Sequence, residues 1–183
     1  ADLEGKKVLV QGIGHVGEVL IEHLSGEGAE IYITDINQQR LEAVSSKYGA
    51  TIFTDADIYG ADMDIYAPCA LGATINDDTI NRINAKVIAG AANNQLADEQ
   101  KHGKILREKG IVYAPDFLIN AGGIINVYAE LEGYDRKEIM RKTENIYNTT
   151  LEILTSADAK KISTHEAALL IAQNRIDERK KQK

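Results

Sequence analysis

Short apolar runs alternate with amphipathic stretches through the first two thirds of the 183-residue chain. Polar, glycine or proline residues bound each apolar run, which is typical of buried strands. The pattern predicts strands at residues 8–10, 29–34, 50–53, 63–68, 86–90 and 111–114. Between them it predicts helices at residues 14–24, 37–48, 76–83 and 99–109. The predicted apolar face of the first helix consists of Val16, Val19, Leu20 and Leu24.

The last third of the chain is predicted to be helical. One apolar stripe along residues 137–154 consists of Ile139, Thr143, Ile146, Tyr147, Leu151 and Leu154. Ser163 and Glu166 have the spacing of a capping box at the start of a final helix. No repeat or low-complexity linker interrupts the chain. We therefore expect one domain over residues 1–183, with residues 137–183 as its C-terminal helical appendage.

Strands that alternate with helices at these intervals predict an α/β fold. The expected architecture is a Rossmann-type, doubly wound and largely parallel sheet, followed by the C-terminal helices. Ligands of such sheets bind at the carboxyl ends of the strands. The residues just after each predicted strand are therefore the candidates for a functional site.

Three glycines follow the first predicted strand with the spacing G-x-G-x-x-G. Gly12 permits a tight turn, Gly14 allows the backbone to approach a pyrophosphate, and Gly17 lets the next helix pack close to the strand. The second strand ends at Asp35, near the roughly 20-residue spacing of an acid that binds a ribose. Strand, glycine turn, helix and acid together predict a dinucleotide-binding site.

Composition narrows the classes of partner. A formal net charge of −7 argues against nucleic acid or an anionic membrane. No apolar run is long enough to span a bilayer. The single cysteine, Cys69, cannot form an internal disulfide, so we expect a reducing, cytoplasmic location. The four histidines are scattered without metal-ligand spacing, so no metal site is predicted.

Four loops after the later strands are more specific than the glycine motif. They are residues 67–72 (APCALG), 90–96 (GAANNQL), 113–116 (YAPD) and 119–123 (INAGG). Together, and in this order, they resemble the Glu/Leu/Phe/Val dehydrogenase family, most of all its leucine dehydrogenase branch. The resemblance covers the C-terminal cofactor domain of such enzymes. His15 and Gly17 depart from it, since close members often have asparagine and alanine there.

The resemblance implies NAD as the cofactor. Asp35 would accept hydrogen bonds from the adenosine ribose and repel a 2′-phosphate, which favours NAD over NADP. Cys69 and Ala70 would lie near the nicotinamide ribose, and Asn93 and Asn120 near the nicotinamide. The implied cofactor-binding set is Gly12, Ile13, Gly14, His15, Val16, Gly17, Asp35, Ile36, Cys69, Ala70, Asn93 and Asn120.

The resemblance also implies a substrate pocket formed by Asn120, Ile124 and Val127. Ile124 and Val127 lie three apart, so on a helix they would face the same way as aliphatic walls for a branched side chain. From the residues alone, other interpretations stay open. Asp35 could be a solvated strand-end acid, Cys69 a reactive thiol, the asparagines loop caps, and the two aliphatic residues part of a core.

The resulting hypothesis is the NAD-binding domain of an oxidatively deaminating, branched-chain L-amino-acid dehydrogenase. The resemblance places the family's catalytic lysines and aspartate in a preceding domain that nothing here matches. We therefore assign no catalytic residue and expect this chain alone to be inactive. The expected partners are NAD(H) and an amino-acid or 2-oxo-acid substrate, and a homo-oligomer stays open. The alternative is a non-catalytic NAD-binding sensor or regulatory module, with a flavin-binding protein third.

Overall fold

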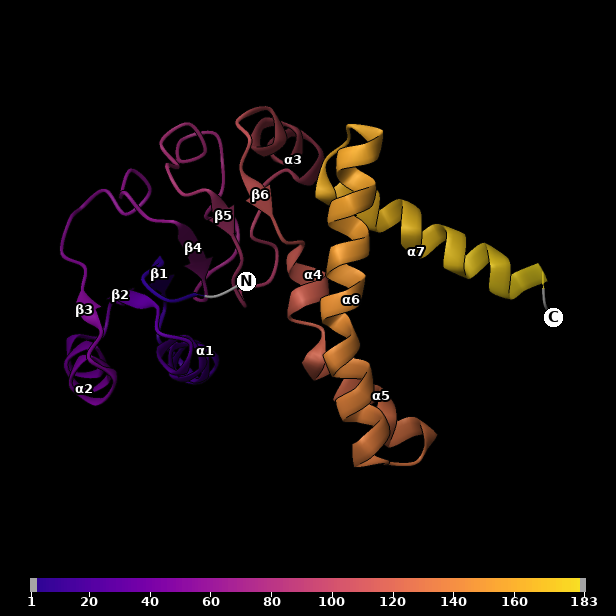
Figure 1. The fold of residues 1–183 in the computed structure, drawn as a ribbon, viewed down its shortest axis with the longest axis horizontal. Coiled ribbons are helices and arrows are strands. Elements are labelled where there is room, and N and C mark those ends of the chain that lie inside the picture. Colours follow the sequence, from indigo (N-terminus) through magenta and orange to yellow (C-terminus); the bar gives the residue numbers. More distant parts are fainter. Residues whose placement is uncertain (1–2, 182–183) are drawn as a thin grey trace.

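The computed structural model describes residues 3–181, which contain a six-stranded sheet with every strand parallel (Figure 1). The strand order is β3-β2-β1-β4-β5-β6, so the chain builds outward from β1 in one direction and then in the other. The bounds are β1 Lys7–Gln11, β2 Glu30–Thr34, β3 Thr51–Ile52, β4 Ile65–Pro68, β5 Val87–Ile88 and β6 Val112–Tyr113. This order places the topological switch point between β1 and β4.

Successive side chains of β1 point to opposite faces of the sheet and so enter two separate cores. Val8 and Val10 pack under α1 (His15–Gly26) and α2 (Gln38–Tyr48), which cover one face of the sheet (Figure 1). Leu9 enters the other core, which α3 (Glu99–Glu108) and the segment before β5 cover. A sheet buried on both faces is the doubly wound α/β architecture, so the predicted fold class is confirmed.

Helix α1 has a different buried face from the predicted one. Its buried residues are Gly17, Ile21 and Leu24, whereas Val16 is 59% and Val19 is 41% exposed. A Cβ on Gly17 would lie 2.2 Å from the carbonyl oxygen of Gly12. This close approach sets the rotation of the helix, so the predicted stripe was wrong at Val16 and Val19, whereas Leu24 is buried and Leu20 packs against the same core.

The predicted helix at residues 76–83 is a series of turns. Asn76 does act as a cap, because its Oδ1 accepts from the backbone N–H groups of Asp78 (3.0 Å) and Thr79 (3.2 Å). The Nζ of Lys109 donates to the carbonyls of Ile80 and Asn81, both at 2.9 Å. Aspartate, threonine and isoleucine are weak helix formers. The carbonyls of Ile80 and Asn81, which would accept from backbone N–H groups in a helix, accept from the Lys109 ammonium instead.

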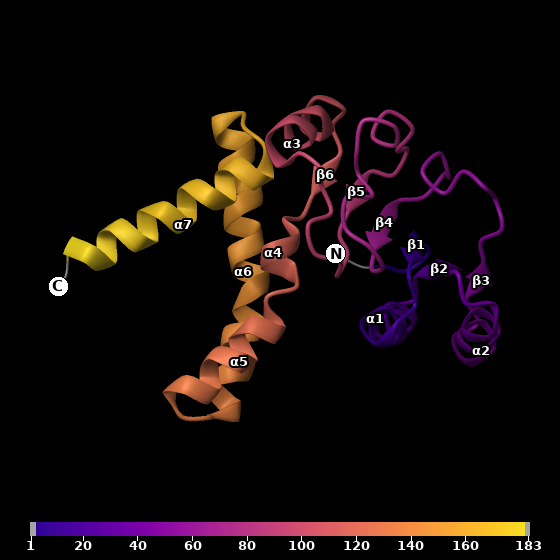
Figure 2. The same cartoon turned by 180° about the vertical axis from the view of Figure 1, so that it is seen from behind.

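Four helices in the described chain follow the sheet. They are α4 (Asp116–Ile119), α5 (Gly122–Glu132), α6 (Arg136–Lys160) and α7 (Thr164–Lys181). Helix α6 lies beyond β6 and packs against the three other helices, while the far end of α7 projects away from the sheet (Figure 2). No helix within residues 3–181 is both long enough and apolar enough to cross a membrane.

The predicted apolar stripe of α6 is only partly buried. Tyr147 and Leu151 are exposed, whereas Ile153 and Ala157 are buried against α7. Small alanines let the two helices approach closely, and a search for large apolar residues overlooks them. The Oγ of Ser163 accepts from the backbone N–H of Glu166 at 3.1 Å, so the predicted start of the last helix is confirmed.

Candidate functional site

A cavity of about 650 Å³ lies where the carboxyl ends of β1, β2 and β4 meet. It spans the switch point of the sheet, which is where ligands of such folds bind. Its lining residues are Gln11, Gly12, Gly14, Thr34, Asp35, Ile36, Asn37, Arg40, Cys69, Ala70, Leu71 and Thr74.

The glycine loop is a close-fitted backbone turn. Gly12 has a φ of +92°, and a Cβ there would lie 2.5 Å from the Cβ of Ala70. Gly14 is the N-cap of α1, and among the described residues no side chain caps that helix. A Cβ on Gly14 would meet no atom of the described chain within 4 Å. The loop therefore leaves backbone N–H groups and open space at the positive end of a helix, which suits a pyrophosphate.

Asp35 connects the end of β2 to this loop. Its Oδ2 accepts from the backbone N–H of Ile13 at 2.8 Å, and its Oδ1 accepts from the backbone N–H of Asn37 at 2.8 Å. Asn37 in turn caps α2 by accepting from the N–H of Arg40 at 3.0 Å. The carboxylate therefore holds the glycine loop and the start of α2 in addition to facing the cavity.

Arg40 is a cavity residue that the sequence analysis missed. It lies in the first turn of α2, and its side chain lines the same cavity as Asp35. The signal was its position, because the first turn of a helix that follows a strand end faces that strand end. A guanidinium here places a positive charge beside the acid, at the end of the cavity expected to receive the ribose.

Cys69 and Ala70 follow β4 at the other side of the glycine loop. The Sγ of Cys69 accepts from the backbone N–H of Ala91 at 3.5 Å. Burial raises the pKa of the Cys69 thiol, and the bond from Ala91 only partly opposes this. A thiol that stays protonated is a poor nucleophile, so the geometry favours a contact role over a reactive one.

Asn93 and Asn120 come from different loops and meet directly. The Nδ2 of Asn120 donates to the Oδ1 of Asn93 at 2.6 Å and lies 3.5 Å from the carbonyl oxygen of Ala91. The structure thus brings together two residues that are 27 positions apart. The pair leaves the Nδ2 group of Asn93 and the Oδ1 of Asn120 as a donor and an acceptor for a ligand.

Asp116 holds the loop that carries Asn93, and this role was also missed. Its carboxylate is buried and accepts from the backbone N–H groups of Gln95 and Phe117, each at 2.8 Å. Its own backbone N–H donates to the hydroxyl of Tyr113 at 3.4 Å. Burial, followed by the charge of Asp116, raises the pKa of Tyr113. The signal lay in the YAPD motif, but only the fold shows that the aspartate faces inward.

Asn93 and Asn120 do not line the cavity, and neither do His15, Val16, Ile124 and Val127. His15 and Val16 are exposed at the start of α1. Ile124 and Val127 share helix α5 as expected, but they are 71% and 60% exposed and do not line the cavity. Two lysines that were not predicted as site residues, Lys86 and Lys101, form ion pairs with Asp64 at 2.8 Å and Asp77 at 2.6 Å respectively. Within residues 3–181, no three His, Cys, Asp or Glu side chains are grouped to hold a metal ion.

Comparisons with known proteins identify the relatives of this chain. Residues 29–183 match the family model of the Glutamate/Leucine/Phenylalanine/Valine dehydrogenases. The chain is 49% identical over 175 residues to the leucine dehydrogenase of Bacillus cereus and 51% identical to that of Thermoactinomyces intermedius. It is 45% identical over 181 residues to the L-tryptophan dehydrogenase of Nostoc punctiforme. Each alignment covers 96–99% of this chain but only 48–51% of the relative, so the chain spans about half their length.

Solved structures show the same fold. A crystal structure of the Nostoc punctiforme L-tryptophan dehydrogenase matches with a TM-score of 0.94, and the alignment covers 98% of this chain and 54% of that one. A glutamate dehydrogenase from Thermus thermophilus matches with a TM-score of 0.72 at 21% identity, covering 97% of this chain and 47% of that one. At that identity, the second match is a statement about fold alone.

Proposed function

This chain belongs to the Glu/Leu/Phe/Val dehydrogenase family, and we propose that it is the NAD-binding domain of an oxidatively deaminating L-amino-acid dehydrogenase. The observation that carries the proposal is the glycine loop, tied to Asp35 through the N–H of Ile13, beside a cavity at the switch point of the sheet. The Rossmann-type fold and the family both fit NAD as cofactor. We propose further that residues 1–183 act as one such domain, with residues 137–183 as its helical appendage.

Each group at the carboxyl edge has a proposed part in holding the cofactor. The N–H groups at the start of α1 would bind the pyrophosphate, and Asp35 would accept from the ribose hydroxyls. Cys69 and Ala70 would contact the nicotinamide ribose. Asn93 and Asn120 would orient the carboxamide, since their paired amides keep one donor and one acceptor available. When bound, NAD accepts the hydride from the α-carbon of the amino acid.

The acid–base groups of the reaction would lie in another part of a longer protein. Loss of a hydride from the α-carbon leaves an imine, and water then converts the imine to a 2-oxo acid and ammonia. This sequence needs a group that accepts the amine proton and a group that activates water. Among the residues lining the cavity there is no lysine or histidine, and the only acid is Asp35, which two backbone N–H groups already engage.

For the substrate we propose a branched aliphatic side chain. The two leucine dehydrogenases named above are 49% and 51% identical to this chain, and the tryptophan dehydrogenase is 45% identical. Ile124 and Val127 present aliphatic surface on α5, which offers no partner for the carboxylate of glutamate. In a full-length enzyme, leucine, isoleucine and valine should therefore be better substrates than phenylalanine or glutamate. Ile124→Ala should raise the relative activity on longer side chains.

The decisive experiment measures binding and turnover on the same preparation. Calorimetry with NADH should give saturable binding. An assay of NAD reduction at alkaline pH, with leucine, valine, phenylalanine or glutamate, should show no turnover. Absence of NADH binding would refute the cofactor site. Turnover that survives repurification and is lost in Asn120→Ala would refute the proposal that the catalytic groups lie elsewhere.

A further inference from the structure

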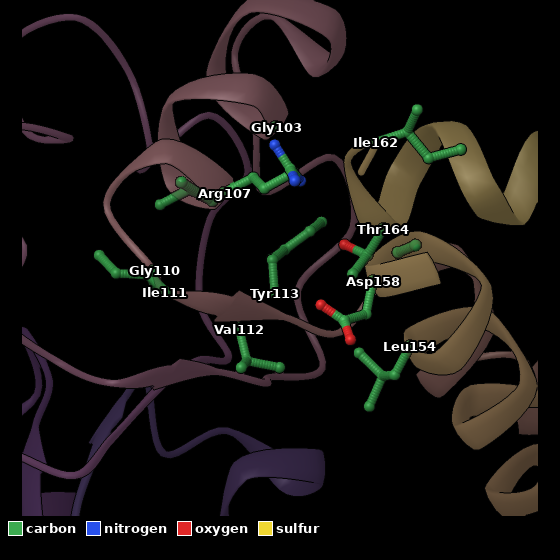
Figure 3. Close-up of a pocket in the computed structure, with 12 residues that line it drawn as sticks. Gly103, Arg107, Gly110, Ile111, Val112, Tyr113, Leu154, Asp158, Ile162 and Thr164 are labelled. Carbon is green, nitrogen blue, oxygen red and sulfur yellow. The ribbon is translucent and has the colours of Figure 1, made fainter. Parts of the chain in front are cut away.

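A second cavity lies beside β6. Its volume is about 320 Å³, and it is enclosed by α3, β6 and the junction between α6 and α7 (Figure 3). Its apolar walls include Leu106, Ile111, Val112, Leu154 and Ile162. Apart from the glycines, most of its surface is therefore aliphatic, and it shares no residue with the nucleotide cavity.

Three polar side chains line this cavity without partners in the described chain. Arg107 reaches from α3 toward the α6–α7 junction, where the Thr164 hydroxyl and the Asp158 carboxylate point back toward β6 (Figure 3). Within residues 3–181, none of the three side chains makes a hydrogen bond or an ion pair, and Arg107 and Asp158 do not pair with each other. The cavity is thus an apolar space with one positive side chain, Arg107, and one negative side chain, Asp158, at its wall.

We propose that this cavity binds a free α-amino acid with an aliphatic side chain. The guanidinium of Arg107 would receive the carboxylate in its two-pronged geometry, and Asp158 would receive the ammonium. The aliphatic walls would bury the side chain. A simple anion would meet the repulsion of Asp158, and a simple cation the repulsion of Arg107, so a zwitterion is the ligand that satisfies both charges. The site is separate from the substrate pocket proposed above and does not depend on it.

The first test compares four small molecules by NMR titration of the 183-residue chain. Leucine should cause saturable shifts in the amides of Leu106, Val112 and Ile162. The amine 3-methylbutylamine and the acid 4-methylpentanoate each lack one charge, and each should bind about three- to five-fold more weakly than leucine, as expected for one partly exposed ion pair. Glycine, which has both charges but no side chain, should cause no saturable shift.

Variants assign each charge to its residue. Arg107→Gln should weaken leucine and 4-methylpentanoate by about three- to five-fold while leaving the amine unchanged. Asp158→Asn should weaken leucine and the amine and leave the acid unchanged. Val112→Phe should fill the cavity and abolish binding of all three ligands. Its matched control is Val19→Phe, since Val19 is 41% exposed and Val112 is 42% exposed, but Val19 lies on α1 away from the cavity.

Three results would overturn the proposal. One is the absence of saturable shifts with leucine at tens of millimolar. Another is leucine shifts confined to Asn120 and α5, which would place the ligand in the substrate pocket. The third is leucine binding that Val112→Phe leaves intact. Should that variant fail to fold, the comparison of the four ligands on the unchanged chain still decides the question. Failure of the chain to bind NADH would refute the proposed function without touching this site.

Discussion

The glycine loop and the Asn93–Asn120 pair lie at the same edge of one sheet, but they are built in different ways. The loop is held by backbone geometry and by a carboxylate whose two oxygens each accept a backbone N–H. The asparagines hold each other through a single bond at 2.6 Å, and the nearby walls Ile124 and Val127 are exposed. The half expected to bind adenosine is thus complete within this chain, whereas the half expected to meet the substrate is open.

The largest effect should follow from a change in the glycine loop. In Gly12→Ala the new Cβ would meet Ala70 at 2.5 Å while φ stays at +92°, so the turn must shift. We expect NADH affinity to fall at least about 100-fold, or about 2.7 kcal/mol, by calorimetry. Gly26→Ala is the control, because a Cβ there meets no atom of the described chain within 4 Å. A Gly12→Ala chain that binds NADH within a factor of three of the unchanged chain would contradict this account.

The difference in affinity between NADH and NADPH should be smaller than the loss caused by Gly12→Ala. We expect NADH to bind at least about ten-fold more tightly than NADPH, a gap of about 1.4 kcal/mol, because Asp35 repels a 2′-phosphate. Asp35→Ser should narrow the gap and also weaken NADH, since the N–H groups of Ile13 and Asn37 lose their acceptor. Arg40→Gln should widen the gap by removing the nearby positive charge. Equal affinities in the unchanged chain would refute the role of Asp35.

Changes in the Asn93–Asn120 pair should lower NADH affinity less than the changes above, and only through the nicotinamide. Asn120→Ala should lower NADH affinity about three- to five-fold, as expected for the loss of one neutral hydrogen bond. It should leave ADP-ribose, which lacks the nicotinamide, unchanged. Asn93→Ala should lower NADH affinity by a similar factor. Because the two amides are bonded to each other, the double variant should lose less binding free energy than the two single variants together. Equal weakening of ADP-ribose would show that the pair supports the whole cavity instead.

The smallest effect is a pH dependence at the amino edge of the sheet, away from both halves. The Lys86 ammonium at 2.8 Å, together with the backbone N–H of Lys7 at 3.2 Å, lowers the pKa of Asp64. A lowered pKa in the folded chain stabilises it above the unfolded value, and this contribution is lost as pH falls through the folded pKa. Asp64→Asn should therefore melt slightly below the unchanged chain at pH 6, and the difference should shrink progressively as the pH falls below about 4 toward the lowered folded pKa.

Two controls make this last measurement specific. Asp62→Asn should change the melting temperature less, because Asp62 is almost fully exposed and meets Lys7 only at 3.5 Å. NADH affinity should be the same in both variants, since neither residue lines the cavity. A melting difference for Asp64→Asn that is as large at pH 3 as at pH 6 would point to lost packing in place of lost charge.

The features that a parallel sheet and its glycine turn require at fixed positions could be predicted from the sequence. Gly12, Gly17 and Asp35 are needed at fixed places in a parallel sheet, so the fold class and the switch point follow from them. The rotation of α1 could not be predicted, because Val16 and Val19 look as apolar as Ile21 until Gly17 is seen against Gly12. The inward-facing Asp116 was missed for the same reason, because its carboxylate holds the N–H of Gln95, 21 residues away. Arg40, by contrast, lies only five residues after Asp35, and its place in the first turn of α2 could have been predicted.

The two outermost strands, β3 and β6, have two residues each, while the central β1 has five. Unpaired backbone groups along the rim of a sheet are a template on which other chains add strands and form aggregates. In this sheet both edge strands are only two residues long, so few backbone groups are unpaired there. The five-residue strand β1 is paired with β2 on one side and with β4 on the other. We therefore expect concentrated solutions of this chain to resist fibril growth from the sheet, because an incoming extended segment finds too few backbone partners at either rim to hold it.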